Sequence, residues 1–132
     1  MKPSKKMVGK VIKTGGLNVW PHEQLMADIL AAAGHVVEFL PPATTDGTQT
    51  PDVLIDGLKW EMKSPRASNL KTVERNLKRA RWQSSRIVFA SHRMKQVPDR
   101  AIERELHQRV KSVKGITSLK FINRHGNIID IL

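Results

Sequence analysis

The sequence predicts an α/β fold in which helices flank a mixed β-sheet, and three observations carry this prediction. Stretches whose apolar residues recur with helical spacing alternate along the chain with short stretches of strand length. The pair Asp56-Gly57 is a strong signal for a tight hairpin between two strands. The run Arg86–Ala90 is almost continuously apolar, which is typical of a strand buried inside a sheet. The resulting order is α-β-β-β-α-β-α-β-β.

The first half of the chain is expected to supply one helix and three strands. Pro21 suits the start of the helix, because the missing N–H of proline has no partner to lose in a first helical turn. Helical spacing of apolar residues continues to about Ala33, and Gly34 ends the helix. The strands are expected at 35–40, 52–55 and 58–63.

The second half is expected to alternate helix and strand before it closes with a hairpin. Its elements are a helix over 68–84, a strand over 86–90, a helix that follows Pro98, and strands over 118–123 and 127–131. The first of these helices has a stripe of apolar residues at helical spacing, formed by Leu70, Val73, Leu77 and Ala80.

The length of 132 residues fits one compact domain, which we place at residues 17–132. Residues 1–16 are expected to form a flexible basic arm, because lysines are scattered there among glycine and proline without a sustained period. The chain has no cysteine, so disulfides and thiolate metal sites are excluded. No apolar run approaches the roughly 20 residues that span a membrane. No apolar segment follows the basic N-terminus, so no signal peptide is expected.

The net charge indicates the kind of partner. Lys and Arg number 23 against 12 Asp and Glu, which gives a formal charge of +11. Such an excess repels itself within a compact body, and a polyanion would relieve the repulsion. Nucleic acid is the expected partner. An anionic membrane surface is the weaker alternative, because it usually calls for a basic amphipathic helix with a bulky apolar face. The simplest alternative is that the net positive charge serves solubility alone and indicates no particular partner.

The predicted hairpin carries three candidate catalytic residues. Asp52 opens its first strand, and Glu61 and Lys63 lie two residues apart on its second strand. Because side chains alternate between the faces of a strand, Glu61 and Lys63 are expected on one face, roughly 6.6 Å apart along the strand. Trp60 and Met62 then point to the other face, which suits a core.

Glu23 is the fourth candidate, because it lies on or beside the apolar face of the first helix. Carboxylates from Glu23, Asp52 and Glu61 in one pocket would repel one another and would be costly to desolvate. A divalent cation resolves both problems, and carboxylate oxygens are the ligands that Mg²⁺ and Mn²⁺ prefer; Zn²⁺ is a third candidate. Lys63 would orient the attacking water or stabilise charge in the transition state. Alternatively, Glu23 interacts favourably with the positive end of the helix dipole, and Glu61 and Lys63 lie on a solvated strand face.

The helix over 68–84 is expected to contribute nucleic-acid contacts. Its polar residues beside the apolar stripe recur at helical spacing and are Thr72, Asn76, Arg79 and Gln83. Arg75 and Arg79 are expected to grip phosphates, and Gln83 to bond the motif or the substrate. The alternative is a solvated basic helix face.

Other chemistries find little support. The chain has no GxSxG motif, no phosphate-cradling glycine loop and no cysteine nucleophile, which disfavours acyl transfer and nucleotide hydrolysis. The five histidines have no metal-ligand spacing. His22 is beside Glu23 and His92 follows a strand, so a place in the lining of the pocket stays open for both, although a surface role is favoured.

Most of the chain, about residues 20–131, resembles a known family. The runs that carry the resemblance are HEQLMADILAAAGHVVEFLPP, TPDVLIDGLKWEMKSP and TVERNLKRARWQSSRIVFA. They are similar to the PD-(D/E)xK nuclease domains that form the C-terminal tRNase toxins of contact-dependent growth inhibition effectors. The resemblance implies a restriction-endonuclease-like core and metal-dependent cleavage of structured RNA, commonly tRNA. It also implies an active-site set of Glu23, Asp52, Glu61 and Lys63, with Gln83 in support.

The resemblance further implies an acidic immunity protein that covers the basic face. It places the activity in the cytoplasm, after delivery to a target cell as part of a secreted effector. Toxin domains of this kind normally end a very long protein, whereas this sequence starts at Met1, so an excised domain and a free-standing relative both remain open. Two other functions also remain open. One is a DNA endonuclease of resolvase or restriction type, and the other is a non-catalytic nucleic-acid-binding module.

Overall fold

The computed structural model describes residues 9–41 and 52–132 and, for Asp52, the backbone alone. The chain divides into two compact units, Met1–Lys59 and Trp60–Leu132. Parallel and antiparallel strands occur together with helices, which confirms the predicted mixed α/β class. No helix in the described ranges is both long and apolar enough to cross a membrane.

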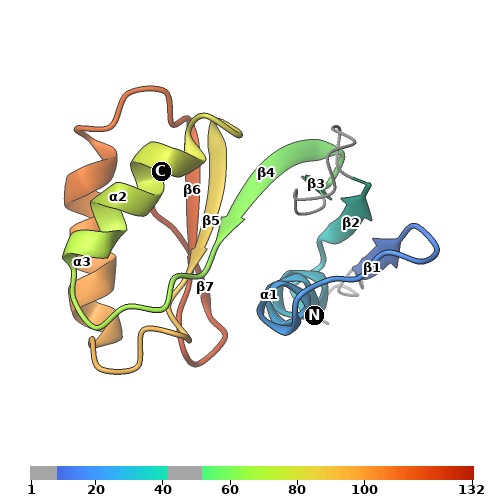
Figure 1. The fold of residues 1–132 in the computed structure, drawn as a ribbon, viewed down its shortest axis with the longest axis horizontal. Helices are drawn as coiled ribbons and strands as arrows, with labels where there is room; N and C mark the ends of the chain where they lie inside the picture. The colour runs from blue at the N-terminus through green and yellow to red at the C-terminus, as the bar shows by residue number, and fades with distance from the viewer. Residues whose placement is uncertain (1–8, 42–51) are drawn as a thin grey trace, which may run out of the picture. The chain divides into compact units, whose positions relative to one another are not determined.

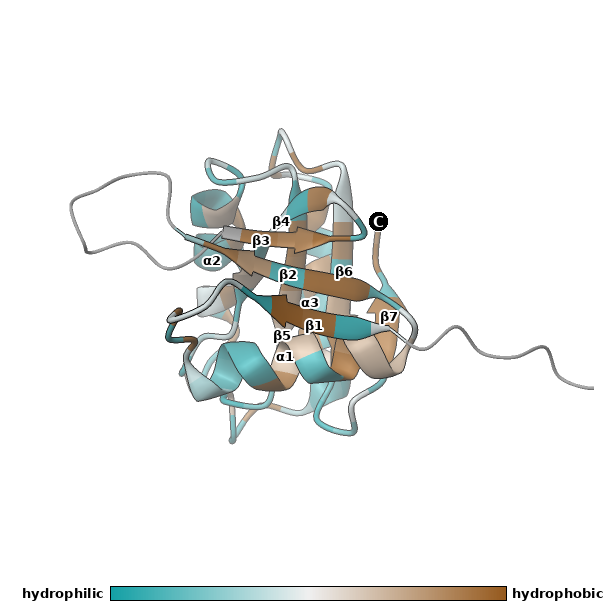
Figure 2. Cartoon of the chain, turned by 90° about the vertical axis from the view of Figure 1, so that its right-hand side faces the viewer, coloured by the Kyte–Doolittle hydropathy of each residue, from teal (hydrophilic) through white to brown (hydrophobic). Residues whose placement is uncertain are grey.

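The first unit contains one helix and three strands in its described part. These elements are β1 (Lys10–Lys13), α1 (Pro21–Ala32), β2 (Val36–Leu40) and β3 (Asp52–Ile55). β2 lies between β1, to which it is parallel, and β3, to which it is antiparallel. Figure 2 shows hydrophobic residues along β2 and β3, whereas α1 carries both hydrophilic and hydrophobic residues. Met26, Leu30, Val37 and Phe39 are fully buried and form the apolar centre.

Strand β1 corrects the prediction that residues 1–16 are an arm throughout. Val11 and Ile12 are its only apolar residues, and its backbone pairs with Val36–Phe39. Gly9 precedes it and donates its N–H to Ala31 O at 3.1 Å. A Cβ atom at Gly9 would lie 2.0 Å from His35 O, so this close approach requires glycine. Residues 1–8 lie outside the described ranges, and the placement of one domain at 17–132 stays a prediction.

The Asp56-Gly57 turn forms as predicted. Both residues have positive φ, 52° and 86°, which is the left-handed conformation that a tight hairpin turn demands. The Asp56 carboxylate accepts a hydrogen bond from Val36 N at 2.9 Å and lies 2.6 Å from His35 Nδ1. These bonds fix a residue that carries a side chain in a conformation usually left to glycine or asparagine.

The second unit alternates strands and helices around its own core. Its elements are β4 (Leu58–Lys63), of which the first two residues belong to the first unit, α2 (Lys71–Ala80), β5 (Arg86–Ala90), α3 (Asp99–Val110), β6 (Ser118–Ile122) and β7 (Ile128–Asp130). β4, β5 and β6 are parallel, and β7 is antiparallel to β6. Helices α2 and α3 lie together on one face of these strands (Figure 1). Ile87, Phe89, Leu119 and Phe121 meet the apolar stripes of both helices there.

Helix α2 is shorter than the predicted 68–84. At its start, Asn69 Oδ1 accepts a hydrogen bond from Lys71 N at 3.0 Å. At its end, the N–H groups of Gln83 and Ser84 both bond to Ala80 O, at 2.8 and 3.0 Å. Gln83 therefore lies in the turn after the helix, and the prediction that it continues the helical line of Thr72, Asn76 and Arg79 is wrong.

Candidate active site

Strand β4 brings Glu61 and Lys63 together. Lys63 Nζ lies 3.4 Å from Glu61 Oε2, so the two side chains share one face, as the spacing predicts. Trp60 is 8% exposed and belongs to the alternate positions of the strand. In the parallel register with β5, Glu61 pairs with Ile87 and Lys63 with Phe89.

The register shows which face of the sheet carries the pair. Ile87 and Phe89 belong to the core beneath α2 and α3, and paired residues of neighbouring strands point the same way. Glu61 and Lys63 therefore lie on the face of the second unit that α2 and α3 cover. Their side chains keep 23% and 24% of their exposure, so solvent reaches both. An ion pair this accessible contributes at most about 1 kcal/mol to stability.

Glu23 occupies the third position of α1, in the first unit. Its Oε1 accepts a hydrogen bond from Trp20 N at 3.4 Å, and the residue is buried. This bond satisfies one free backbone N–H ahead of the helix, as a capping glutamate does. Glu23 thus has a structural role in addition to any chemical one.

Asp52 begins β3, where its backbone pairs with Leu40. Its side chain lies outside the part of the chain that the structure describes. Within that part, no three acidic or histidine side chains are grouped so as to hold a metal ion. The metal-binding roles of Glu23, Asp52 and Glu61 therefore stay predictions from the sequence.

The residues expected on the nucleic-acid face of α2 differ in exposure. Arg75 and Arg79 are exposed. Thr72 is buried, and Asn76 Nδ2 donates to Thr72 O at 2.8 Å and to Thr72 Oγ1 at 3.3 Å, so both side chains are engaged within the helix. Gln83 is exposed in the turn that follows. Of this set, the two arginines and Gln83 are the most accessible to a ligand.

The whole net charge of the chain is carried by the second unit. Residues 60–132 contain 17 Lys and Arg against six Asp and Glu, whereas residues 1–59 contain six of each. Most of the acidic groups of the second unit are already paired, in the contacts Glu61–Lys63, Glu74–Lys78, Glu105–Arg109, Asp130–Lys120 and Asp99–Arg124. Many cations are left over, and they favour a polyanionic ligand.

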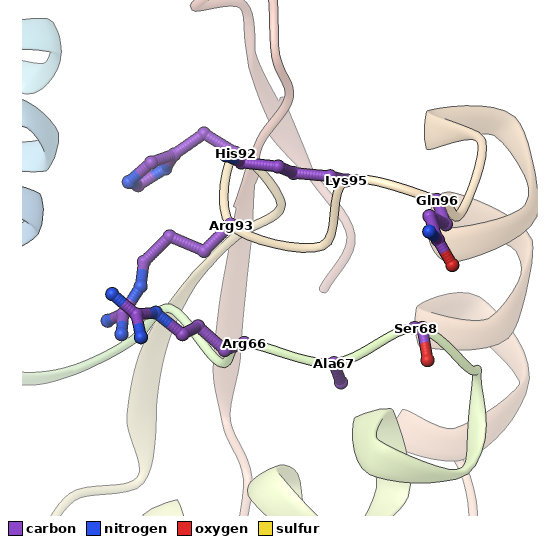
Figure 3. Close-up of a pocket in the computed structure, with 7 residues that line it drawn as sticks. All are labelled: Arg66, Ala67, Ser68, His92, Arg93, Lys95 and Gln96. Atoms are coloured by element: carbon purple, nitrogen blue, oxygen red, sulfur yellow. The ribbon is translucent and has the colours of Figure 1, made fainter.

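A basic pocket of about 660 Å³ lies beyond the ends of two parallel strands, and the sequence analysis did not identify it. It is lined by the segment that follows β4 and the loop that follows β5, through Arg66, Ala67, Ser68, His92, Arg93, Lys95 and Gln96 (Figure 3). Burial, and next the charge of Arg93, lowers the pKa of His92 below its usual value. One rule could have pointed to this pocket from the sequence, namely that ligands bind outside the carboxyl ends of parallel strands.

Comparison with known proteins gives two matches. Residues 49–128 match the family described as the contact-dependent growth inhibition CdiA C-terminal domain. A solved structure, described as a CdiA-CT/CdiI toxin and immunity complex from Burkholderia pseudomallei, has a chain of similar fold. The TM-score is 0.66 and the identity 21%, over 92% of this chain and 98% of that one. At this identity the likeness shows the fold alone. Comparison with curated proteins gave no match.

Proposed function

The chain belongs to the contact-dependent growth inhibition CdiA C-terminal domain family, and we propose that it is the nuclease domain of a toxin of that family. The observation that carries the proposal is the Glu61–Lys63 pair, 3.4 Å apart, on a unit that holds the whole charge excess of the chain. A carboxylate beside an ammonium group is a combination that phosphodiester hydrolysis uses. The surrounding cations suit a polyanionic substrate.

Each residue of the pair has a distinct role in this proposal. The Glu61 carboxylate accepts a proton from the attacking water or helps to orient that water. The Lys63 ammonium stabilises the negative charge that builds on the phosphate oxygens in the transition state. Their contact at 3.4 Å holds the two groups side by side on one face of β4.

Two further carboxylates belong to the proposed site on the strength of the sequence pattern. The oxygens of Glu23, Asp52 and Glu61 have the donor chemistry for a divalent cation, Mg²⁺ or Mn²⁺ first and Zn²⁺ second. Such a cation, when bound, supplies Lewis acidity to a phosphodiester oxygen and to water. Lys63 stabilises the negative charge of the transition state through its own ammonium group, independently of the cation.

We propose structured RNA, and tRNA in particular, as the substrate. Exposed Arg75 and Arg79 on α2 contact its phosphates, and Gln83 contacts the substrate or the Glu61–Lys63 pair. Thr72 and Asn76 act indirectly, because their mutual hydrogen bond stiffens the same helix face. The activity takes place in the cytoplasm of a target cell, to which a secreted effector delivers the domain.

An acidic immunity protein is the proposed partner of the basic unit. The similar solved structure is described as a complex of a toxin with an immunity protein, which supports a partner of this kind. Carboxylates on that partner would neutralise cations of the second unit and would exclude nucleic acid from the same surface.

The test is cleavage of total tRNA and of plasmid DNA by the purified protein, with Mg²⁺, Mn²⁺, Zn²⁺ or EDTA. Glu61→Gln and Lys63→Met are the informative variants. Glu74→Gln and Lys78→Met are the matched controls, because they alter an exposed Glu–Lys pair of similar separation, 3.7 Å, on α2. We expect metal-dependent cutting of tRNA that only the first two variants lose.

Other outcomes would decide against the proposal in different ways. Cutting of DNA alone would replace the RNase with a DNA endonuclease. Binding without cutting, unchanged in Glu61→Gln, would leave a basic nucleic-acid-binding module.

A further inference from the structure

We propose that the basic pocket formed by residues 66–68 and 92–96 binds a phosphate group of the nucleic acid, a few nucleotides from the bond that is cut. The proposal rests on the nuclease function above and names the part of the protein that holds the substrate beside the Glu61–Lys63 pair. Arg66 follows Lys63 by three residues, so their Cα atoms are at most about 11 Å apart.

The charge of the pocket is the first argument. Arg66, Arg93 and Lys95 all line it, and within the described residues none of them pairs with a carboxylate. Arg66 and Arg93 extend their guanidinium groups toward the same side of the pocket (Figure 3). Like charges gathered in this way repel, and an anion bound between them relieves the repulsion. The planar guanidinium group matches a phosphate through two parallel hydrogen bonds.

The loop that follows β5 is fixed before any ligand arrives. Met94 and Val97 are buried in the core, at 0% and 6% exposure, while Arg93, Lys95 and Gln96 line the pocket. Ser91 Oγ donates to Asp99 Oδ1 at 2.5 Å, and Ser91 N bonds to Ile122 O at 3.1 Å. Arg93 and Lys95 are therefore presented from a loop that needs little ordering on binding, which saves conformational entropy.

A second clamp holds the same loop from the β6–β7 turn. Arg124 donates its backbone N–H to Asp99 Oδ2 at 2.9 Å, and its guanidinium group donates to the backbone carbonyl of Met94. Arg124 is thereby committed to structure, which distinguishes it from the unpaired Arg66 and Arg93. The pocket also contains neutral groups for a phosphate oxygen, namely the Ser68 hydroxyl and the Gln96 amide.

The test compares two double variants, each built on Glu61→Gln so that the labelled tRNA stays intact. Arg66→Ala with Arg93→Ala empties the pocket of guanidinium groups. Arg100→Ala with Arg104→Ala removes the same charge from exposed positions of α3 and is the control. Fluorescence anisotropy gives the dissociation constant for tRNA from 50 to 300 mM salt, and thermal melting checks that both variants fold.

We expect the pocket variant to lose about one phosphate contact, because the two arginines bind the same phosphate. The slope of log K against log salt should then become less negative by roughly 0.7 to 0.9, with a smaller change in the control. Equal slopes and equal affinities in the two variants would overturn the proposal. If only the pocket variant lost binding to polyglutamate while tRNA binding was kept, the pocket would instead serve an acidic protein partner.

The outcomes for the pocket and for the active site are separable. If the Glu61→Gln protein still cuts tRNA on a gel, the proposed active site is wrong, whatever the effect of changing Arg66 and Arg93. If the unaltered protein cuts tRNA and Glu61→Gln protein binds it without cutting, the active site stands. A salt slope that does not depend on Arg66 and Arg93 would then remove the pocket alone.

Discussion

Lys63 Nζ and Glu61 Oε2 lie 3.4 Å apart on the face of the second unit that α2 and α3 cover. Because both side chains remain about one quarter exposed, the pair contributes little to folding, and any strong effect of its removal would concern chemistry. This separation of activity from stability makes the pair a direct test of the nuclease proposal.

Lys63→Met is expected to lower the single-turnover rate of tRNA cleavage by about 10²- to 10³-fold, the usual effect of removing one transition-state donor. The free energy of unfolding should change by less than about 1 kcal/mol in urea titrations. Lys78→Met should leave both quantities nearly unchanged. A loss of activity that merely follows a loss of folded protein would count against a catalytic Lys63.

The sequence was sufficient for elements whose pattern is local and strong. The strands at 58–63 and 86–90 were predicted to the residue, because alternating and continuously apolar runs bounded by turn residues are distinctive. β1 was missed, since Val11 and Ile12 alone give no period and the strand exists through pairing with β2. The ends of α2 were misplaced because Asn69 and Ala80, rather than the apolar stripe, set them.

Part of the candidate site was likewise predicted from the sequence, and part was not. The shared face of Glu61 and Lys63 follows from the two-residue period of a strand, and it was predicted. The pocket was not, because Arg66 and Arg93 come together only through the parallel pairing of β4 with β5. The grouping of Glu23 and Asp52 with Glu61 stays a prediction.

Asp99→Ala should lower the free energy of unfolding by about 1–3 kcal/mol. The change leaves the Arg124 backbone N–H and the Ser91 hydroxyl without their carboxylate acceptor. Affinity for tRNA should fall as well, although Asp99 is an anion, because the loop that carries Arg93 loses its clamp. Urea titration and anisotropy on the same protein check both effects. Tighter tRNA binding with unchanged stability would show that Asp99 acts only through its charge.

Gly9→Ala should destabilise the first unit by about 1–3 kcal/mol, since the new Cβ meets a backbone carbonyl that cannot rotate away. Hydrogen exchange resolved by residue should show the loss at β1 and at the end of α1. Gly15→Ala is the matched control, because nothing lies within 4 Å of a Cβ there. Equal protection in both variants would argue that β1 contributes nothing to the stability of this unit.

Stability should fall as the pH drops below the usual His92 pKa of 6.5. The pKa of His92 is lowered in the folded protein, first by burial and then by the charge of Arg93, so the unfolded chain binds the proton more readily. The contribution is therefore fully present above pH 6.5 and is lost as the pH falls through the folded pKa. His92→Gln should flatten the dependence of the unfolding free energy on pH between pH 7 and pH 5, relative to the original protein, with His107→Gln as an exposed control.

Bound phosphate should raise the His92 pKa in NMR titrations if the pocket takes an anion, because the anion offsets the charge of Arg93. A His92 pKa that does not respond to phosphate would place the anion elsewhere.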